Sequence, residues 1–93
     1  MKIFQSGSFA RRVKKLTASE KAGLDNIIKE IISSPGLGVE KKGDLKGIFI
    51  HKFKLQKTEY LLAYRLIEVE AIELIMIGPH ENYYRNLKNY LQC

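Results

Sequence analysis

Three cationic side chains in the second half of the chain are spaced like neighbours on one face of a β-sheet. Lys52 and Lys54 are two residues apart, so both point to the same side of one strand, and Arg65 has the parity to join them from the next strand. Three cations in this arrangement would bind phosphate and stabilise the extra charge of a pentacovalent transition state. Surface strands also carry lysines that prevent edge pairing and keep a protein soluble, so both interpretations stay open.

His80 is the second candidate for chemistry. It follows Gly78 and Pro79 and precedes an expected helix, which would place its imidazole at a helix N-terminus. Backbone N–H groups and the positive end of the helix dipole favour an anion and a neutral imidazole there. A neutral imidazole can act as a general base near pH 7, although a histidine at this place can equally serve as a cap or turn residue. His51 falls on the expected core face, which favours a structural role.

Other residue patterns restrict the chemistry further. Of Tyr83 and Tyr84, one should pack in the core while the other stacks on a base or bonds a phosphate, and we assign the RNA contact to Tyr84. The sequence has no glycine-rich phosphate loop, no HExxH motif and no metal-type Cys or His spacing. Asp44, Glu73 and Glu81 form no convincing metal cluster, so we expect no metal and no cofactor. A nuclease here would use the RNA 2′-OH as its nucleophile, which excludes DNA as a substrate.

Length and charge indicate one basic domain. The 93 residues leave room for a single core, so residues 1–93 are expected to form one domain, and 45% apolar residues are enough to build that core. Sixteen Lys and Arg against ten Asp and Glu give a net charge of +6, which favours an anionic partner such as nucleic acid. A soluble basic surface without a partner is the plainer alternative.

Cysteine usage and hydropathy predict a cytoplasmic protein. Cys93 is the only cysteine, which excludes an internal disulfide and a cysteine metal site. No long apolar run follows Met1, so we expect no signal peptide. No apolar segment approaches the ~20 residues that span a bilayer, so we expect no membrane partner.

The first half of the chain is expected to be a strand followed by two helices. Lys2–Gln5 is typical of a short strand, and Ser8 is expected to cap a helix that ends near Leu16. Thr17 and Glu20 have the spacing of a capping box at the start of a second helix, which continues to about Ser33. Its apolar residues repeat at helical spacing, which predicts one buried stripe. They are Leu24, Ile27, Ile28, Ile31 and Ile32.

The second half is expected to be a three-stranded meander followed by a helix. A polar loop, Leu37–Lys46, should precede three strands with short connections. The strands and the final helix are expected at about Gly47–Leu55, Tyr60–Glu68, Ala71–Ile77 and Glu81–Leu91. The order β-α-α-β-β-β-α predicts an α+β domain in which an antiparallel meander packs against the two N-terminal helices, with a short C-terminal helix.

Alternation along the strands divides their side chains between two faces. The expected core face carries Phe49, His51, Phe53, Leu55, Leu62, Tyr64, Leu66, Ile72, Leu74 and Met76. The other face mixes basic and apolar side chains and should be covered in part by the last helix or by a partner. It carries Ile48, Ile50, Lys52, Lys54, Leu61, Ala63, Arg65, Ile67, Glu73, Ile75 and Ile77.

Four fragments, together with the element order and basic charge, resemble the RelE/ParE superfamily of bacterial toxins from toxin–antitoxin operons. The fragments are Asp44–Gly47, His51–Leu55, Tyr60–Arg65 and Gly78–Tyr84. Their order and spacing are similar to those of RelE-type and YafQ-type ribosome-dependent mRNA endonucleases, and the resemblance covers nearly the whole chain.

The resemblance implies a metal-independent mRNA endoribonuclease that works in the ribosomal A site and is blocked by an acidic antitoxin. By position, Lys52 and Lys54 match strand lysines used for phosphate contact and proton transfer. His80 matches a catalytic position, and Tyr84 lies near the aromatic position that orients mRNA. Basic residues of such toxins also bind ribosomal RNA. The residues expected to do so here are Arg11, Arg12, Lys14 and Lys15.

One departure from the pattern keeps a second function open. Leu61 stands where RelE-type enzymes often have an arginine, and Arg65 is the nearest substitute. ParE-type members of the superfamily share the fold, lack the nuclease residues and inhibit DNA gyrase. In that case the basic first helix or the last helix would be the binding surface. A third alternative is a basic RNA- or protein-binding module without toxicity.

Overall fold

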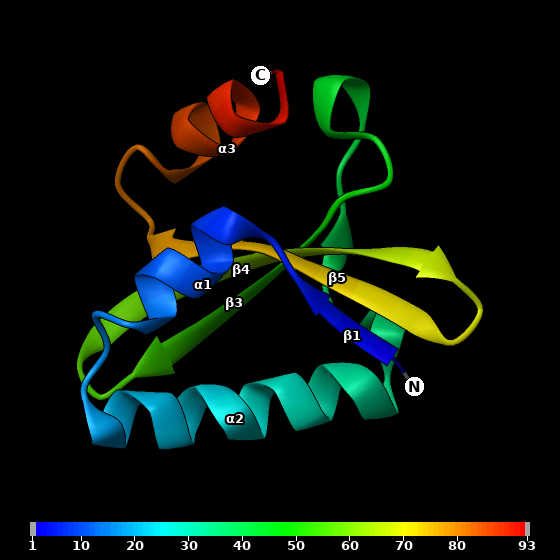
Figure 1. Cartoon of the computed structure of the whole chain (residues 1–93). Coiled ribbons are helices and arrows are strands. Elements are labelled where there is room, and N and C mark those ends of the chain that lie inside the picture. Colours follow the sequence, from blue (N-terminus) through cyan, green and yellow to red (C-terminus); the bar gives the residue numbers. More distant parts are fainter. Residues whose placement is uncertain (1, 93) are drawn as a thin grey trace.

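The computed structural model describes residues 2–92, apart from the side chains of Asp44 and Gln92. Met1 and Cys93 therefore lie outside the described residues. The expectation that Asp44 belongs to no metal cluster concerns a side chain that is also outside them. Three helices and two short 3-10 turns surround one five-stranded sheet of strand order β1-β5-β4-β3-β2 (Figure 1). The elements are β1 (Lys2–Gln5), α1 (Gly7–Val13), α2 (Ala18–Ser33), η1 (Pro35–Leu37), β2 (Val39–Glu40), η2 (Gly43–Leu45), β3 (Phe49–Leu55), β4 (Thr58–Glu68), β5 (Ala71–Pro79) and α3 (Tyr83–Gln92).

The expected α+β architecture is confirmed, with one addition at the sheet edge. β3, β4 and β5 form the antiparallel meander, and β1 extends it by pairing with β5 in parallel. α2 covers one face of the sheet and α3 lies over the other (Figure 1). Within residues 2–92, each helix is too short or too polar to cross a bilayer.

The predicted capping box of α2 is present. The Glu20 N–H donates to Thr17 Oγ1 over 3.1 Å, and the Thr17 N–H donates to Glu20 Oε1 over 2.9 Å. Two orphan donors of the first turn are thereby satisfied. The helix ends at Ser33 as expected, because Pro35 cannot continue it.

The predicted boundaries of the first helix are wrong at both ends. Ser6, and not Ser8, is the N-cap: its hydroxyl accepts the Phe9 N–H over 3.1 Å and donates to the Ile75 carbonyl of β5. The bond to Ile75 explains why Ser6 and not Ser8 is the cap, because it joins the start of α1 to the sheet. α1 ends at Val13, and the chain up to Leu16 forms a tighter turn.

The expected loop at Leu37–Lys46 contains regular structure. β2 pairs with the start of β3, and the 3-10 turns η1 and η2 flank it. Buried Tyr64 holds this segment: its hydroxyl donates to the Pro35 carbonyl over 2.7 Å and accepts the Gly38 N–H over 2.9 Å. Gly47 is no part of β3, since its φ of 86° does not fit a strand.

The boundaries of the later elements also differ by a few residues. The β3–β4 turn is formed by Gln56 and Lys57, with Gln56 at a φ of 56°, so β4 begins at Thr58 and not at Tyr60. β5 continues to Pro79. α3 begins at Tyr83 and not at Glu81, because Asn82 has a φ of 59°, which is outside the helical region.

A β-bulge in β5 reverses two of the predicted side-chain directions. Ala63 pairs with Met76 while Tyr64 pairs with Leu74, which leaves Ile75 as the extra residue. A bulge shifts the alternation of every residue beyond it. Met76 consequently packs with the cluster beneath α3, and Ile77 packs on the α2 side, opposite to the prediction for both.

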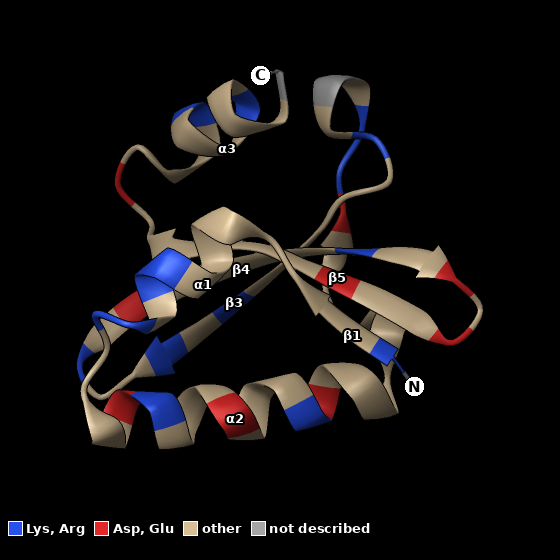
Figure 2. Cartoon of the chain, viewed as in Figure 1, with Lys and Arg blue, Asp and Glu red and all other residues tan. Residues whose placement is uncertain are grey.

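One end of the sheet extends beyond the helices. The β4–β5 hairpin exposes Leu66, Ile67 and Val69 by 45%, 52% and 94%, so the prediction that Leu66 is a core residue is wrong. Ile3 and Phe4 of the neighbouring edge strand are also exposed. Acidic residues surround the hairpin tip, whereas α1 at the opposite end is basic (Figure 2). The tip of the hairpin is therefore acidic and apolar, and the basic residues of α1 lie away from it.

Candidate functional site

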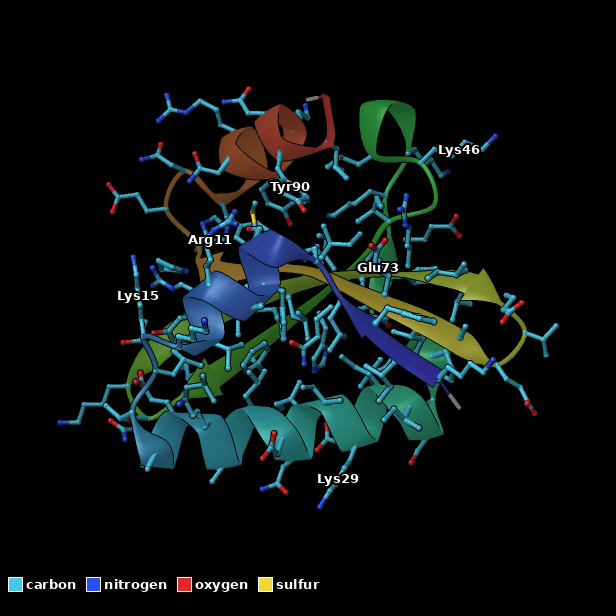
Figure 3. All side chains as sticks on the ribbon, in the orientation of Figure 1. Arg11, Lys15, Lys29, Lys46, Glu73 and Tyr90 are labelled. Atoms are coloured by element: carbon cyan, nitrogen blue, oxygen red, sulfur yellow. The ribbon has the colours of Figure 1, made fainter. Side chains whose placement is uncertain are left out.

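A basic cleft lies between the first helix and the end of β5. Its volume is about 560 Å³. One wall carries the four cations that were expected to bind RNA, Arg11, Arg12, Lys14 and Lys15. The opposite wall contains Gly78, Pro79 and Glu81, which flank His80 along the chain. Figure 3 shows Arg11 and Lys15 projecting from α1 and the turn after it. The structure thus brings the four predicted cations together on one surface.

Arg12 has an unsatisfied donor in this region. Its Nε is buried and has no hydrogen-bond partner among the described residues. A buried N–H without an acceptor costs free energy, so an anion that reached Arg12 would gain from satisfying it. The cleft therefore has the charge to attract an anionic ligand, and one of the arginines that line it has a buried donor without a partner among the described residues.

His80 lies in a bend before α3, further from the start of the helix than predicted, because α3 begins at Tyr83 and not at Glu81. Asn82 adopts a φ of 59°, outside the helical region, so helical geometry begins only at Tyr83. The His80 carbonyl accepts the Tyr83 N–H over 3.2 Å. The imidazole is exposed and lies ahead of the first turn, where the helix dipole acts less strongly than expected.

Tyr83 anchors this bend to the sheet. Its side chain is 2% exposed, and its hydroxyl donates to the Met76 carbonyl at the bulge over 2.6 Å. Burial raises the pKa of the Tyr83 phenol far above its ordinary value. Tyr83 is thus the packing member of the tyrosine pair, as the sequence indicated that one of the two would be.

Tyr84 joins three elements at the start of α3. Its ring meets the His80 ring edge-on, with 6.3 Å between ring centroids, and the Tyr83 ring edge-on at 5.8 Å. The Lys41 ammonium lies over the ring, 5.3 Å from its centroid. Sequence reasoning missed Lys41, because it lies in a segment without hydrophobic periodicity. The only signal was the local density of lysines at residues 41–46.

Lys52 and Lys54 are exposed on β3, on the α3 side of the sheet. Lys52 is aligned with Leu61 and Gly78 on the next two strands, which places it about 10 Å from Gly78 at ~4.8 Å per strand. Lys54 lies opposite Glu59. Leu61 is fully buried between Lys52 and Gly78, so this row has no cation at its centre.

Arg65 does not join the other cations. Its guanidinium Nε lies 2.6 Å from Glu73 Oε1, in an ion pair across β4 and β5. It is also four residues from Leu61 along β4, which corresponds to about 13 Å at ~3.3 Å per residue. Shared parity put Arg65 on the expected face, but distance along the strand separates it from Lys52.

His51 lies on the α2 side of the sheet, as its parity predicted. Its ring stacks on Phe53 with 5.9 Å between centroids. Partial burial lowers the pKa of His51 below its ordinary value, and the charge of Glu30 opposes that shift. His51 and His80 are therefore in different environments on different parts of the molecule. The described residues contain no group of three or more His, Cys, Asp or Glu side chains that could hold a metal ion.

Comparison with known proteins places the chain in a family. Residues 3–88 match the family described as ParE-like toxin of type II bacterial toxin–antitoxin systems. The chain belongs to this family of toxins. This confirms the resemblance to the RelE/ParE superfamily. No match to this toxin was found among curated proteins.

Solved structures show the same fold in RelE of E. coli. RelE in the intact E. coli RelBE toxin–antitoxin complex has a TM-score of 0.68 at 21% identity, covering 86% of this chain and 96% of that chain. Isolated E. coli RelE gives 0.66 at 22% identity, covering 96% and 97%. An arginine double mutant of E. coli RelE in the free state gives 0.72 at 18% identity, covering 98% and 95%. The toxin therefore has a RelE-like fold.

Proposed function

We propose that this toxin is an endoribonuclease that cleaves mRNA in the translating ribosome. One observation carries the proposal: the cleft lined by Arg11, Arg12, Lys14 and Lys15 is also lined by Gly78, Pro79 and Glu81, the chain neighbours of His80. RNA phosphates bound in this cleft would pass close to the His80 imidazole, which is the candidate proton acceptor. The RelE-like fold is consistent with this function.

The reaction would use the 2′-OH of the RNA itself. His80 accepts the 2′-OH proton as the oxygen attacks the adjacent phosphorus, and Lys52 stabilises the charge of the phosphorane. The bond to the 5′ oxygen then breaks, with Lys54 as the candidate donor of the proton that this oxygen takes up. The products are a 2′,3′-cyclic phosphate and a 5′-OH. His80 and Lys54 can exchange the roles of base and acid in this scheme.

Arg65 has no part in this scheme, because Glu73 pairs with its charge and its position along β4 is far from Lys52. The cations of α1 take over the binding of flanking phosphates. Tyr84 keeps its proposed RNA contact, although Lys41 already covers one face of its ring.

We further propose that a cognate acidic antitoxin binds the toxin and covers the basic cleft. The net charge of +6 and the gathering of α1 cations at one end of the molecule favour an acidic partner there. E. coli RelE, which has the same fold, is found in a toxin–antitoxin complex. Action on ribosomes would place the toxin in the cytoplasm.

The proposal is tested by mapping mRNA ends in a cell-free translation reaction, with and without ribosomes. We expect new 3′ ends at A-site codons only during translation. His80→Ala should abolish them, whereas the matched control His51→Gln, on the α2 side of the sheet, should leave them. Intact mRNA with the wild-type toxin, or equal cleavage by both variants, would contradict the proposal.

A specific observation also favours inhibition of DNA gyrase. Leu61 is fully buried where RelE-type enzymes, which the sequence resembles, often have an arginine. In that case His80→Ala would be harmless, and substitutions in α1 would relieve inhibition in a gyrase supercoiling assay. Inhibited supercoiling together with intact mRNA would decide for this alternative.

A further inference from the structure

Lys41 occupies a defined place at the edge of the sheet. It directly follows β2, and its backbone N–H donates to the Ile48 carbonyl over 2.9 Å. Its side chain is partly buried and reaches the ring of Tyr84, so it connects the edge of the sheet to α3. The backbone bond and the ring together restrict where the ammonium can go.

The ring that holds Lys41 is itself fixed from the sheet. Tyr84 packs edge-on against Tyr83, and the buried Tyr83 hydroxyl is bonded to the Met76 carbonyl. The same ring meets His80 edge-on. A short series of contacts thus sets the position of the Lys41 ammonium relative to the His80 imidazole.

The charge of Lys41 is not neutralised within the described part of the chain, where Lys41 takes part in no ion pair. Lys42, Lys46 and one carboxylate, Glu40, line the same pocket of about 400 Å³, so lysines outnumber acidic residues there. This pocket shares no lining residue with the α1 cleft. A lysine ammonium over an aromatic face keeps its charge and the N–H donors that point away from the ring, so it can still attract an anion.

We propose that Lys41 is a phosphate-binding residue of the RNA site and that Tyr84, whose ring also meets His80, positions its ammonium group. The inference rests on the proposed endoribonuclease function, because it assumes that RNA passes His80. The α1 cations would bind the strand on one side of His80, and Lys41 would bind a phosphate on the other side. Tyr84 then acts mainly by holding this lysine.

The test measures binding without cleavage. A short fluorescein-labelled single-stranded RNA with 2′-O-methyl groups throughout lacks the attacking hydroxyl, so it stays intact whether or not the toxin is a nuclease. Its affinity is measured by fluorescence anisotropy over a range of salt concentrations. The toxin variants are Lys41→Met, Lys41→Arg and the matched control Lys42→Met, which removes a neighbouring charge that has no aromatic contact in the described residues.

We expect Lys41→Met to weaken binding about tenfold at low salt and to make the slope of log affinity against log salt shallower by about 0.7, the value for one lost phosphate contact. Lys41→Arg should restore both, since arginine also binds phosphate and stacks on a ring. Lys42→Met should stay within about twofold of wild type.

A second comparison tests the part of Tyr84. In a Tyr84→Leu background, Lys41→Met should cost much less affinity than in the wild-type toxin, because the lysine is no longer held. Equal affinities of Lys41→Met and Lys42→Met, full additivity with Tyr84→Leu, or no RNA binding by the wild-type toxin would each overturn the inference. Failure of cleavage alone, with these binding results intact, would count against the proposed reaction and not against the Lys41 site.

Discussion

Arg65 and Glu73 face each other across β4 and β5, with 2.6 Å between the guanidinium Nε and the carboxylate Oε1. The arginine that the sequence offered as a catalytic cation is thereby held by a carboxylate of its own sheet. The pair is largely solvent-exposed, so its own contribution to stability is small, on the order of 0–1 kcal/mol. Its main consequence is electrostatic, since a neutralised cation attracts a phosphate less strongly.

Arg65→Ala should therefore leave mRNA cleavage within about threefold of wild type. His80→Ala removes the proposed proton acceptor and should lower the cleavage rate by about 100-fold or more. Both rates are obtained from primer extension on translating ribosomes at a fixed toxin concentration. A loss with Arg65→Ala as large as that with His80→Ala would restore Arg65 to the reaction.

Ser6→Ala should destabilise the fold by about 1–3 kcal/mol, because the Phe9 N–H and the Ile75 carbonyl both lose a partner. Ser8→Ala is the matched control and should change the free energy of unfolding by less than about 0.5 kcal/mol. Urea unfolding followed by circular dichroism measures both. If Ser8→Ala were the more damaging change, the helix would be capped differently from the structure.

Tyr83→Phe removes the hydroxyl that donates to the Met76 carbonyl and leaves that buried acceptor unpaired. We expect a loss of about 1–3 kcal/mol in the free energy of unfolding. Tyr84→Phe keeps the ring and its contacts with His80 and Lys41, so the stability should be nearly that of wild type. Thermal or urea unfolding of the two single variants provides the comparison, and equal losses would argue against the buried hydrogen bond.

His51 should make stability depend on pH just below neutrality. Its pKa in the folded chain is lower than the ordinary 6.5, so between those two values the unfolded chain binds more protons than the folded chain. The free energy of unfolding should therefore fall as the pH drops through 6.5, and His51 should have no such effect at higher pH. His51→Gln should reduce the difference in stability between about pH 7.5 and about pH 5.5. An unchanged difference would show that other groups cause it.

The elements that sequence reasoning located well are those determined by local chemistry. The Thr17–Glu20 capping box and Pro35 set the ends of α2 without help from the rest of the chain. The choice between Ser6 and Ser8 as the cap of α1 depends on a carbonyl 69 positions away from Ser6, and no local pattern reports that. The bulge at Ile75 is similarly hidden, because Ile75, Met76 and Ile77 are all apolar and suit either face.

The candidate site was predictable in its residue types and less so in its geometry. Basic charge and the resemblance to RelE-type toxins assigned Arg11, Arg12, Lys14 and Lys15 to RNA binding, but the cleft requires β5 to end beside α1. The alternation of side chains correctly predicted that Lys52 and Arg65 lie on one face of the sheet. It gives no information on how far apart they are along the strands. The pairing of β2 with β3 places Lys41 against Tyr84. β2 has only two residues, which is too short for a strand pattern to be recognised in the sequence.

The parallel pairing of β1 with β5 has a consequence for the order of events during synthesis. β1 cannot pair until β5 has been synthesised, because Lys2–Gln5 is aligned with Ala71–Leu74. Contacts between such distant parts of a chain slow folding. A nascent chain released before β5 would lack a docking place for β1 and α1 and one wall of the basic cleft. Chains truncated before β5 should therefore be harmless, because the toxin can fold into its active form only after β5 has been made.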